Sequence, residues 1–297
     1  MNRRTTRRRG MSRAGACIMG CVAMVVSCPA SAHLLPPDLA FYGPFTAPSV
    51  RCLRVISMAT QRCFTRVLSL QRDCTDHELA GQPCDASSRD AQIAAAKQTA
   101  QAAVADTCLG GQLTELAFSS FDEAQADVAR ACGDQSDAVM SMVYGPAAST
   151  GASASLAAST AACMAQTAEA SQKLLHLSVR WRSRAFDRMG TRLILPSKKF
   201  AMMAQVDAQV ASATQALAGH VLNACATFVA IYGEDPLTVL KKLRSRADCV
   251  VNGAYVQSEV TCPAPVCGNG IKETGEQCDD GNQIDTDACR NNCTLGP

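Results

Sequence analysis

Residues 50–74 read VRCLRVISMATQRCFTRVLSLQRDC, and they predict the architecture more directly than any other part of the helical region. Their apolar side chains recur every three or four residues, which is the pattern of an amphipathic helix. Cys52, Cys63 and Cys74 are spaced by eleven residues, and on a helix this spacing returns each thiol to within about 20° of the previous one. We therefore predict that the three cysteines share the buried stripe of one helix.

The residues that follow predict further helices. Ser87 or Ser88 can cap an alanine-rich helix that runs to Cys108, and the glycine pair at 110–111 ends it. A shorter helix is expected over residues 122–131. The predicted fold class is therefore mostly α.

The second part of the helical region is less uniform. Residues 145–162 are rich in alanine and serine and read as a linker or a weak helix start. Over residues 172–196, apolar and polar side chains alternate between Leu175 and Trp181, which fits a β-hairpin. A helix through the same residues is the alternative, and the pattern leaves the choice open. A long helix is expected from a cap at Ser197 to Tyr232, where Gly233 stops it.

Residues 1–32 have the character of an export signal. Residues 1–13 contain six arginines and no acidic residue, and an apolar run covers residues 14–26. Ala-Ser-Ala at 30–32 then offers a cleavage site. The run is too short for a transmembrane span, and we expect no span elsewhere. Cleavage at this site is favoured over a lipid anchor on Cys28, which Pro29 follows directly. The expected location is secreted, periplasmic or on the cell surface.

Cysteine usage fits an exported protein. The chain has 17 cysteines, and three of them would leave with the signal. The even number that remains indicates a disulfide framework of up to seven bridges. Zinc ligation is disfavoured because the sequence has no CxxC pair. The pairing is left open among the cysteines that remain: Cys52, Cys63, Cys74, Cys84, Cys108, Cys132, Cys163, Cys225, Cys249, Cys262, Cys267, Cys278, Cys289 and Cys293.

Cysteine spacing also indicates an imperfect internal repeat. Cys108 and Cys132 are 24 residues apart, and so are Cys225 and Cys249. The run from Leu70 to Cys108 resembles uncharacterised cysteine-rich helical domains of secreted bacterial proteins, a resemblance that implies no activity. We divide the chain into a signal peptide (1–32), a disulfide-stapled helical bundle (33–261, with related halves at about 45–148 and 153–258) and a small irregular cysteine-rich module (262–297).

The carboxy-terminal module has the most specific motif. Residues 267–293 read CGNGIKETGEQCDDGNQIDTDACRNNC, with no apolar run that could form a core. The segment resembles the Myxococcus cysteine-rich repeat, and the matching positions are Cys267-Gly268-Asn269-Gly270, Gly275-Glu276, Cys278-Asp279-Asp280-Gly281-Asn282, Thr286-Asp287-Ala288-Cys289 and Cys293. The resemblance implies an extracellular interaction or structural module without chemistry of its own.

The same module offers a possible calcium site. Calcium prefers several oxygen ligands held close together, although the spacing here is not that of an EF-hand loop. The alternative is that these side chains cap turns and keep the module hydrated. No other cofactor is expected. The calcium ligands would be Asp279, Asp280, Asn282, Asp285 and Asp287.

A basic cluster is the clearest charged feature of the helical region. It could meet an anionic envelope surface or a polysaccharide, or it could be a solvated face. Without residues 1–32 the chain has 22 basic and 26 acidic side chains, so we expect no nucleic-acid partner. The cluster comprises Arg180, Arg182, Arg184, Arg188, Arg192, Lys198 and Lys199, with Asp187 against it.

The sequence has none of the common catalytic motifs: no G-x-S-x-G, no P-loop, no G-x-G-x-x-G and no H-E-x-x-H. Cleavage of the signal would leave His33 as the first residue, but no second histidine has a context that suggests a copper site. We therefore expect a non-enzymatic structural or interaction protein with a protein or envelope-surface partner. A calcium-dependent adhesion or ligand-binding protein and a secreted enzyme without a recognisable motif are the alternatives.

Overall fold

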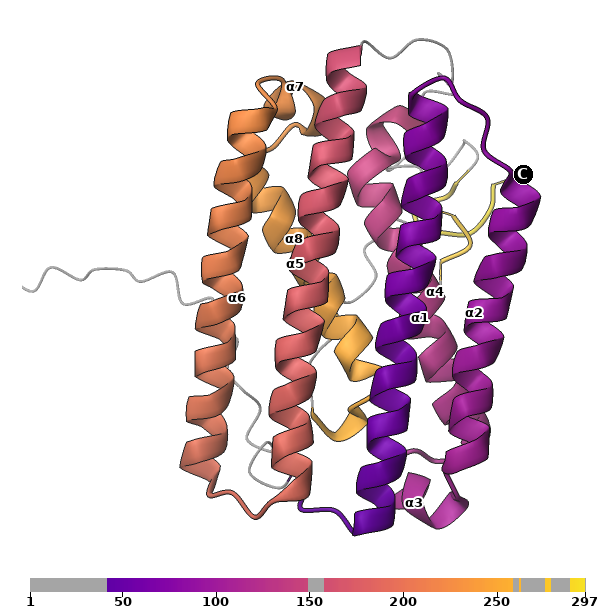
Figure 1. Ribbon diagram of the computed structural model, residues 1–297, viewed down its shortest axis with the longest axis vertical. Helices are drawn as coiled ribbons and strands as arrows, with labels where there is room; N and C mark the ends of the chain where they lie inside the picture. Colours follow the sequence, from indigo (N-terminus) through magenta and orange to yellow (C-terminus); the bar gives the residue numbers. More distant parts are fainter. Residues whose placement is uncertain (1–41, 149–157, 259–261, 263–275, 279–288, 297) are drawn as a thin grey trace, which may run out of the picture. The chain divides into compact units, whose positions relative to one another are not determined.

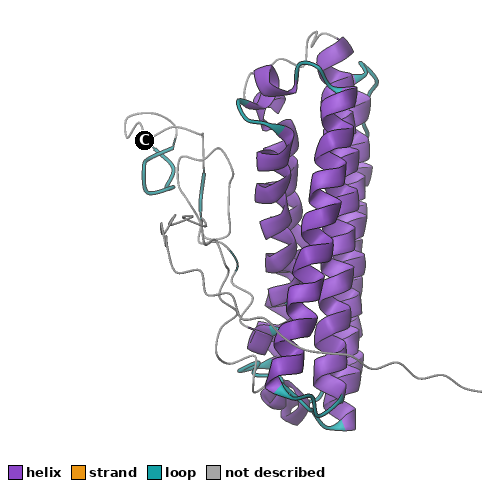
Figure 2. Cartoon of the chain, turned by 90° about the vertical axis from the view of Figure 1, so that its left-hand side faces the viewer, coloured by secondary structure: helices purple, strands orange, loops and turns teal. Residues whose placement is uncertain are grey.

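The fold is mostly α, as predicted (Figures 1 and 2). The computed structural model describes residues 42–148, 158–258, 262, 276–278 and 289–296. Within these residues there is no β-strand, and one isolated antiparallel bridge joins Cys289 to Leu295. None of the described helices combines the length and the apolar character that crossing a bilayer requires.

The helices follow one another in two similar successions. In each, a long helix is followed by a second long helix, a one- to two-turn helix and a further helix. Whether the two successions are related halves stays a prediction. The described helices are α1 (Ala47–Leu79), α2 (Ala86–Thr107), α3 (Gly110–Glu115), α4 (Phe121–Ala148), α5 (Ala158–Thr191), α6 (Pro196–Ala224), α7 (Phe228–Tyr232), α8 (Pro236–Asn252) and the 3₁₀ turn η2 (Val256–Ser258).

Two layers of helices enclose the core. Figure 1 shows α6, α5, α1 and α2 side by side in front of α8 and α4, and the packing pairs agree: α5 contacts α6, α8 and α1, while α1 contacts α2 and α4. Figure 2 shows the helix axes running close to parallel. The chain thus folds as a bundle whose central front helices are α1 and α5.

Helix α1 buries the predicted cysteine stripe. Cys52, Cys63 and Cys74 are 0%, 3% and 4% exposed, and Ile56 and Val67 lie between them in the core. The prediction of one shared buried stripe is confirmed. Because eleven residues make slightly more than three whole turns, each thiol meets a different neighbour along the same face.

Disulfides join the ends and middles of the helices. Cys52 is the sixth residue of α1 and pairs with Cys108 at the C-cap of α2; Cys163 is the sixth residue of α5 and pairs with Cys225 at the C-cap of α6. Cys293 is also disulfide-bonded. The remaining bridges between described cysteines are Cys63–Cys132, Cys74–Cys84, Cys249–Cys262 and Cys278–Cys289.

The structure decides or corrects several predicted elements over residues 145–196. Residues 172–191 belong to helix α5, so no hairpin forms there. The buried side chains Leu174, Leu175, Ser178 and Val179 follow helical spacing. The apolar residues at every second position between Leu175 and Trp181 are part of this broad buried side of the helix and do not indicate a strand. Residues 145–148 end α4, and 158–162 begin α5.

Three predicted helix ends were wrong. The helix expected over 122–131 continues to Ala148. The helix expected to run to Tyr232 ends at Ala224, because Cys225 is tied to α5 and adopts a non-helical C-cap; Gly233 instead stops α7, in the left-handed conformation. Helix α2 is capped by Asp85, which accepts from the Ser88 backbone N–H over 3.0 Å, rather than by a serine.

The start of α6 and the end of α2 also differ from the prediction. Leu195 is the N-cap of α6, where Ser197 was expected, and Pro196 occupies the first turn. The glycine pair at 110–111 does not end the preceding helix but opens α3, because α2 already ends at Thr107. The glycine pair therefore does lie at a boundary between two helices, but it begins the second helix and does not end the first.

Candidate functional site

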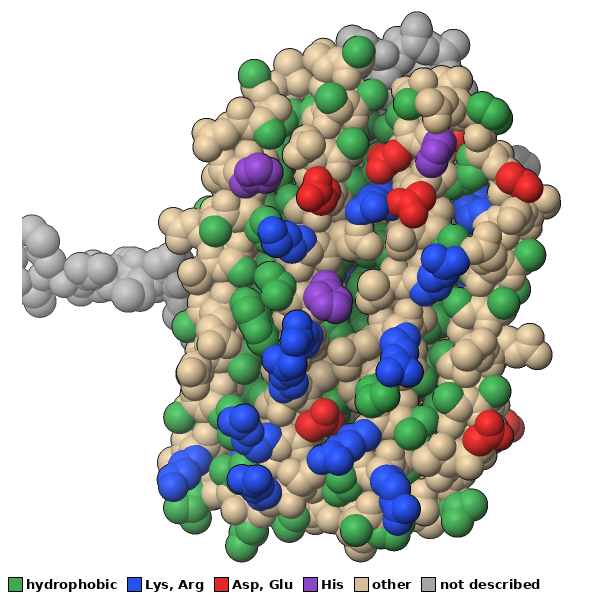
Figure 3. Space-filling model, viewed as in Figure 1, with side chains coloured by type: hydrophobic (Ala, Val, Ile, Leu, Met, Phe, Trp, Pro, Cys, Tyr) green, Lys and Arg blue, Asp and Glu red, His purple; other side chains and the backbone are tan. Residues whose placement is uncertain are grey.

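Helices α1 and α5 present two rows of cations on one face. The helices run antiparallel, because the Phe45 N–H, just before α1, donates to the Gly190 carbonyl near the end of α5 over 2.8 Å, and Arg72 near the end of α1 bonds Gln172 early in α5. Figure 3 shows Lys and Arg side chains gathered over these helices. We define the basic face as the exposed residues Arg51, Arg54, Arg62 and Arg66 of α1 and Lys173, Arg180, Arg184 and Arg188 of α5.

Helical spacing explains why these side chains share a face. Within each row, neighbours are three, four, seven or eight residues apart, and such residues return to the same side of a helix. Each row spans fifteen residues, or about 22 Å at the helical rise. None of the eight cations lies within 4.0 Å of a carboxylate oxygen in the part of the chain that the structure describes.

Asp187 is the acid of α5 nearest to these cations in sequence, and it is engaged in the core. The Tyr255 hydroxyl donates to its Oδ1 over 2.9 Å. Burial raises the pKa of Asp187, while the hydrogen bond from Tyr255 and the charge of Arg54 act in the opposite direction. The carboxylate is thus held under the face by Tyr255.

Two members of the sequence-predicted cluster lie elsewhere. Arg182 is buried and pairs with Asp207 of α6 over 2.9 Å and with Asp248 of α8 over 2.7 Å. Lys199 is 2% exposed and donates to the Tyr42 carbonyl. Arg182 comes two residues after Arg180, which places it on the opposite side of the helix.

The remaining members stay on the surface. Arg180, Arg184 and Arg188 form the α5 row, while Arg192 and Lys198 are exposed around the α5–α6 turn. Sequence reasoning missed the α1 row as a partner of this cluster. Arg51, Arg54 and Arg62 fall away from the apolar stripe of residues 50–74, which indicates that they are exposed. Their position beside α5, however, depends on tertiary packing.

A buried polar network fixes the base of the basic face. The Tyr255 hydroxyl is 2.7 Å from the Ser57 Oγ of α1 and 3.2 Å from the Ser183 carbonyl of α5. The Tyr255 ring lies 5.3 Å, centroid to centroid, from Phe186. Burial raises the pKa of the Tyr255 phenol well above its usual value, so the hydroxyl stays a donor. Tyr255 therefore ties the segment after α8 to both helices that carry the cations.

Glu115 anchors the first turn of α1. Its carboxylate accepts from the Thr46 N–H and hydroxyl, both over 2.7 Å, and from the Ser49 hydroxyl. A carboxylate at a helix N-terminus satisfies otherwise unpaired donors. The hydrogen bonds from Ser49 and then Thr46 lower the pKa of Glu115. The start of the α1 row is thereby held by the end of α3.

A shallow groove of about 420 Å³ lies between α1 and α2. Small side chains, mostly alanine, line it, and Arg62 and Arg66 stand at its α1 side; the Arg66 Nη2 donates to the Gln92 Oε1 over 2.6 Å. Acid–base or nucleophilic catalysis needs a titratable pair or an activated nucleophile, and the lining residues supply neither. The chemistry of this groove favours binding of an anionic or apolar group.

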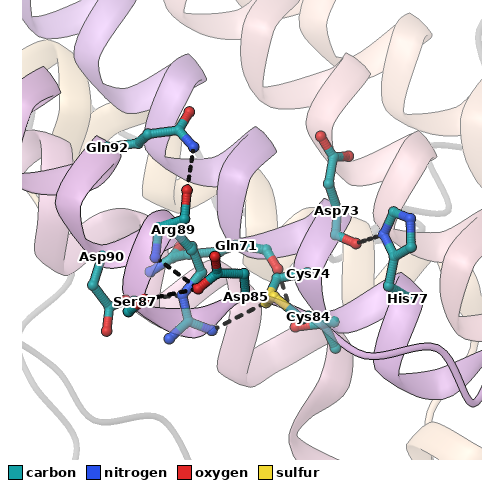
Figure 4. The surroundings of a disulfide bond; sticks show 12 residues. Gln71, Asp73, Cys74, His77, Cys84, Asp85, Ser87, Arg89, Asp90 and Gln92 are labelled. Carbon is teal, nitrogen blue, oxygen red and sulfur yellow. Dashed lines mark hydrogen bonds and ion pairs between the residues drawn. A yellow bond between two sulfur atoms is a disulfide. The ribbon is translucent and has the colours of Figure 1, made fainter.

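Among the described residues, one group of side chains has the geometry of a metal-ligand cluster, and it lies at the Cys74–Cys84 bridge. Its sulfurs and a Glu78 carboxylate oxygen lie within 4.8 Å of one another. Both sulfurs are joined in a disulfide, and zinc requires thiolates, so the bridged form is not a zinc site. Figure 4 shows Arg89 beside the bridge, with its Nη1 3.4 Å from the Cys74 Sγ.

Several predicted site residues lie outside the described residues. They include all five proposed calcium ligands, which fall within 279–288, together with Cys267, Cys28 and His33. In the described part of the module, Cys278 pairs with Cys289, and the Gln277 N–H donates to the Cys293 carbonyl over 2.8 Å. The calcium site, the lipid anchor and the signal cleavage stay predictions.

Comparison with protein families gave one match. Residues 248–294 match a domain of unknown function, DUF4215. The matched region begins in α8 and contains the Cys249–Cys262 and Cys278–Cys289 bridges, so a cysteine-rich repeat module is present at this end of the chain. Neither the curated proteins nor the solved structures that were compared with the chain gave a match.

Proposed function

We propose that this protein is an exported, non-enzymatic interaction protein that docks on an anionic envelope surface through its basic face. The observation that carries the proposal is the pair of cation rows on α1 and α5, in which no cation lies within 4.0 Å of a carboxylate oxygen of the described residues. The disulfide framework supports an oxidising location outside the cytoplasm.

The charges act collectively in this proposal. A single exposed ion pair contributes about 0–1 kcal/mol, so no one arginine would hold a partner. Eight cations on two rows of about 22 Å can engage many charges of a polyanion at once. The Debye length is about 8 Å at physiological salt, so this attraction acts at contact range and weakens with added salt.

The rigidity of the scaffold supports the same use. The basic face is fixed from beneath by Tyr255 and at one end by Glu115, and Cys52–Cys108 ties the start of α1 to the end of α2. A preorganised charge pattern loses less conformational entropy on binding. For the carboxy-terminal module we propose the Myxococcus type of cysteine-rich repeat, with a structural or interaction role beside the bundle.

The experiment measures binding to a polyanion of repeating charge. Dextran sulfate is the probe and uncharged dextran the control ligand. The triple variant Arg180→Gln, Arg184→Gln, Arg188→Gln should weaken binding to dextran sulfate at least tenfold. A charge-matched triple variant on α4 and α8, with Arg130, Lys241 and Lys242 each changed to Gln, should bind as the wild type does. Equal binding by both triple variants would exclude the basic face as the docking surface.

A further inference from the structure

The turn between α5 and α6 exposes two leucines to solvent. Leu193 is 88% exposed and Leu195 is 64% exposed, while Ile194 between them packs against the core. Side chains in an extended segment alternate in direction, so one inward residue fixes the turn and its two neighbours point outward. Figure 1 shows this turn at the lower end of both helices.

The base of the turn is anchored on both sides. The Leu195 carbonyl accepts from the Lys198 and Lys199 N–H groups over 2.9 and 3.1 Å, which caps α6. On the α5 side, Met189 and Gly190 are buried, and the Gly190 carbonyl accepts from the Phe45 N–H. The leucines therefore project from a fixed support.

Cations surround the exposed leucines. Arg188, Arg192 and Lys198 are all exposed within five residues of Leu193, and Figure 3 shows blue side chains over this part of α5 and α6. Apolar side chains at a tip with Lys and Arg beside them match the two layers of an anionic bilayer surface, where phosphates lie above the acyl chains. A polysaccharide offers the negative charge but no apolar phase.

We infer that the α5–α6 turn inserts Leu193 and Leu195 into the surface of an anionic lipid bilayer, while Arg188, Arg192 and Lys198 contact lipid phosphates. This inference rests on the proposed function, because it names the anionic surface that the basic face meets. It requires no membrane-spanning helix, since the contact is confined to the headgroup region and the first part of the acyl chains.

Vesicle flotation tests the inference. The wild-type protein should float with vesicles of phosphatidylglycerol and phosphatidylcholine and stay at the bottom with vesicles of phosphatidylcholine alone. The double variant Leu193→Ser, Leu195→Ser should bind the anionic vesicles at least tenfold more weakly and still bind dextran sulfate as the wild type does. The matched control is Leu222→Ser, because Leu222 is 56% exposed near the far end of helix α6, about 39 Å from the turn along the helix axis. This variant should bind the anionic vesicles as the wild type does.

A second readout reports insertion directly. The chain has one tryptophan, Trp181, so a Leu193→Trp variant in a Trp181→Phe background places a single fluorophore at the tip. Its emission should shift to shorter wavelength with anionic vesicles. Unchanged emission, or wild-type flotation of the double leucine variant, would overturn the inference. If the wild-type protein bound dextran sulfate but not anionic vesicles, the lipid inference alone would be overturned. If the wild-type protein bound neither, the proposed function would also be refuted.

Discussion

The Arg182 Nε on α5 lies 2.7 Å from the Asp248 Oδ1 on α8. The Arg182 side chain is 7% exposed and that of Asp248 is 16% exposed, so this ion pair is largely shielded from water. A second pair joins Arg182 to Asp207 of α6. One arginine thus links three helices of the bundle, and its inward direction separates it from the exposed cations before and after it on α5.

Removing the Arg182 charge should destabilise the protein strongly. Arg182→Ala removes the cation that lies 2.7 Å from the largely buried Asp248 carboxylate, and breaking such a pair costs about 3 kcal/mol or more. The control is Arg184→Ala, an exposed position two residues on, which should change the free energy of unfolding by less than about 0.5 kcal/mol. Urea denaturation measures both, and equal stability of the two variants would contradict the assigned role of Arg182.

Two glycine-to-alanine changes should have opposite effects. At Gly253, at the end of α8, an added Cβ would lie 2.7 Å from the Ala131 Cβ and 3.1 Å from the Asp127 carbonyl of α4. Gly253→Ala should therefore destabilise the bundle by about 1–3 kcal/mol. Gly219 lies in α6, with nothing within 4 Å of an added Cβ, so Gly219→Ala should stabilise by up to about 1 kcal/mol. Thermal unfolding of both variants checks the close α4–α8 approach, which would be refuted by an unchanged midpoint for Gly253→Ala.

The stability lost on removing a disulfide should follow the length of chain that it closes. Cys52–Cys108 and Cys163–Cys225 close 56 and 62 residues, whereas Cys74–Cys84 closes 10. In the chain-entropy account, the two long bridges should contribute almost equally, and the short one about 1.5 kcal/mol less. Paired Cys→Ala variants, compared by chemical denaturation, provide the measurement. A larger loss from Cys74→Ala, Cys84→Ala than from either long pair would contradict this expectation.

The Glu115 cap should make stability depend on pH in the acid range. Hydrogen bonds lower the folded-state pKa of Glu115 below its usual 4.5, so its stabilising effect is complete above pH 4.5 and is lost as the pH falls through the folded-state pKa. The stability difference between wild type and Glu115→Gln should therefore shrink as the pH falls below 4.5.

A second variant separates this cap from other acids. Ser49→Ala removes the donor that lowers the Glu115 pKa most, so it should weaken the same acid-range dependence without changing the carboxylate. Unfolding midpoints between pH 3 and pH 7 provide the test. A constant difference between wild type and Glu115→Gln over this range would show that the cap does not act through the ionised carboxylate.

The helical class and the buried face of α1 were predictable from sequence because both depend on local periodicity. The eleven-residue spacing of Cys52, Cys63 and Cys74 fixes their common side whatever they contact. The long helices around Val179 and Val139 were harder to predict, since alternating or alanine-rich segments carry a weak local signal and tertiary packing determines their extent. Disulfide pairing depends on distances between helices, and the sequence left it open.

The candidate site was predictable only in part, for a similar reason. The sequence identified the cations of α5 as a group but could not separate Arg182 and Lys199, because their partners Asp248 and Tyr42 are distant in sequence and near in space. Nor could it place Arg54 of α1 beside α5. A surface formed by two antiparallel helices emerges only when the bundle is assembled.

The central claim is that the basic face docks the protein on anionic surfaces by electrostatic attraction. The most direct measurement is the affinity of the wild-type protein for dextran sulfate as a function of sodium chloride concentration, beside the Arg180, Arg184 and Arg188 triple Gln variant. The account predicts that wild-type affinity falls steadily as salt rises and that the variant binds more weakly with a shallower dependence. An affinity that does not change with salt, or the same dependence in both proteins, would contradict it.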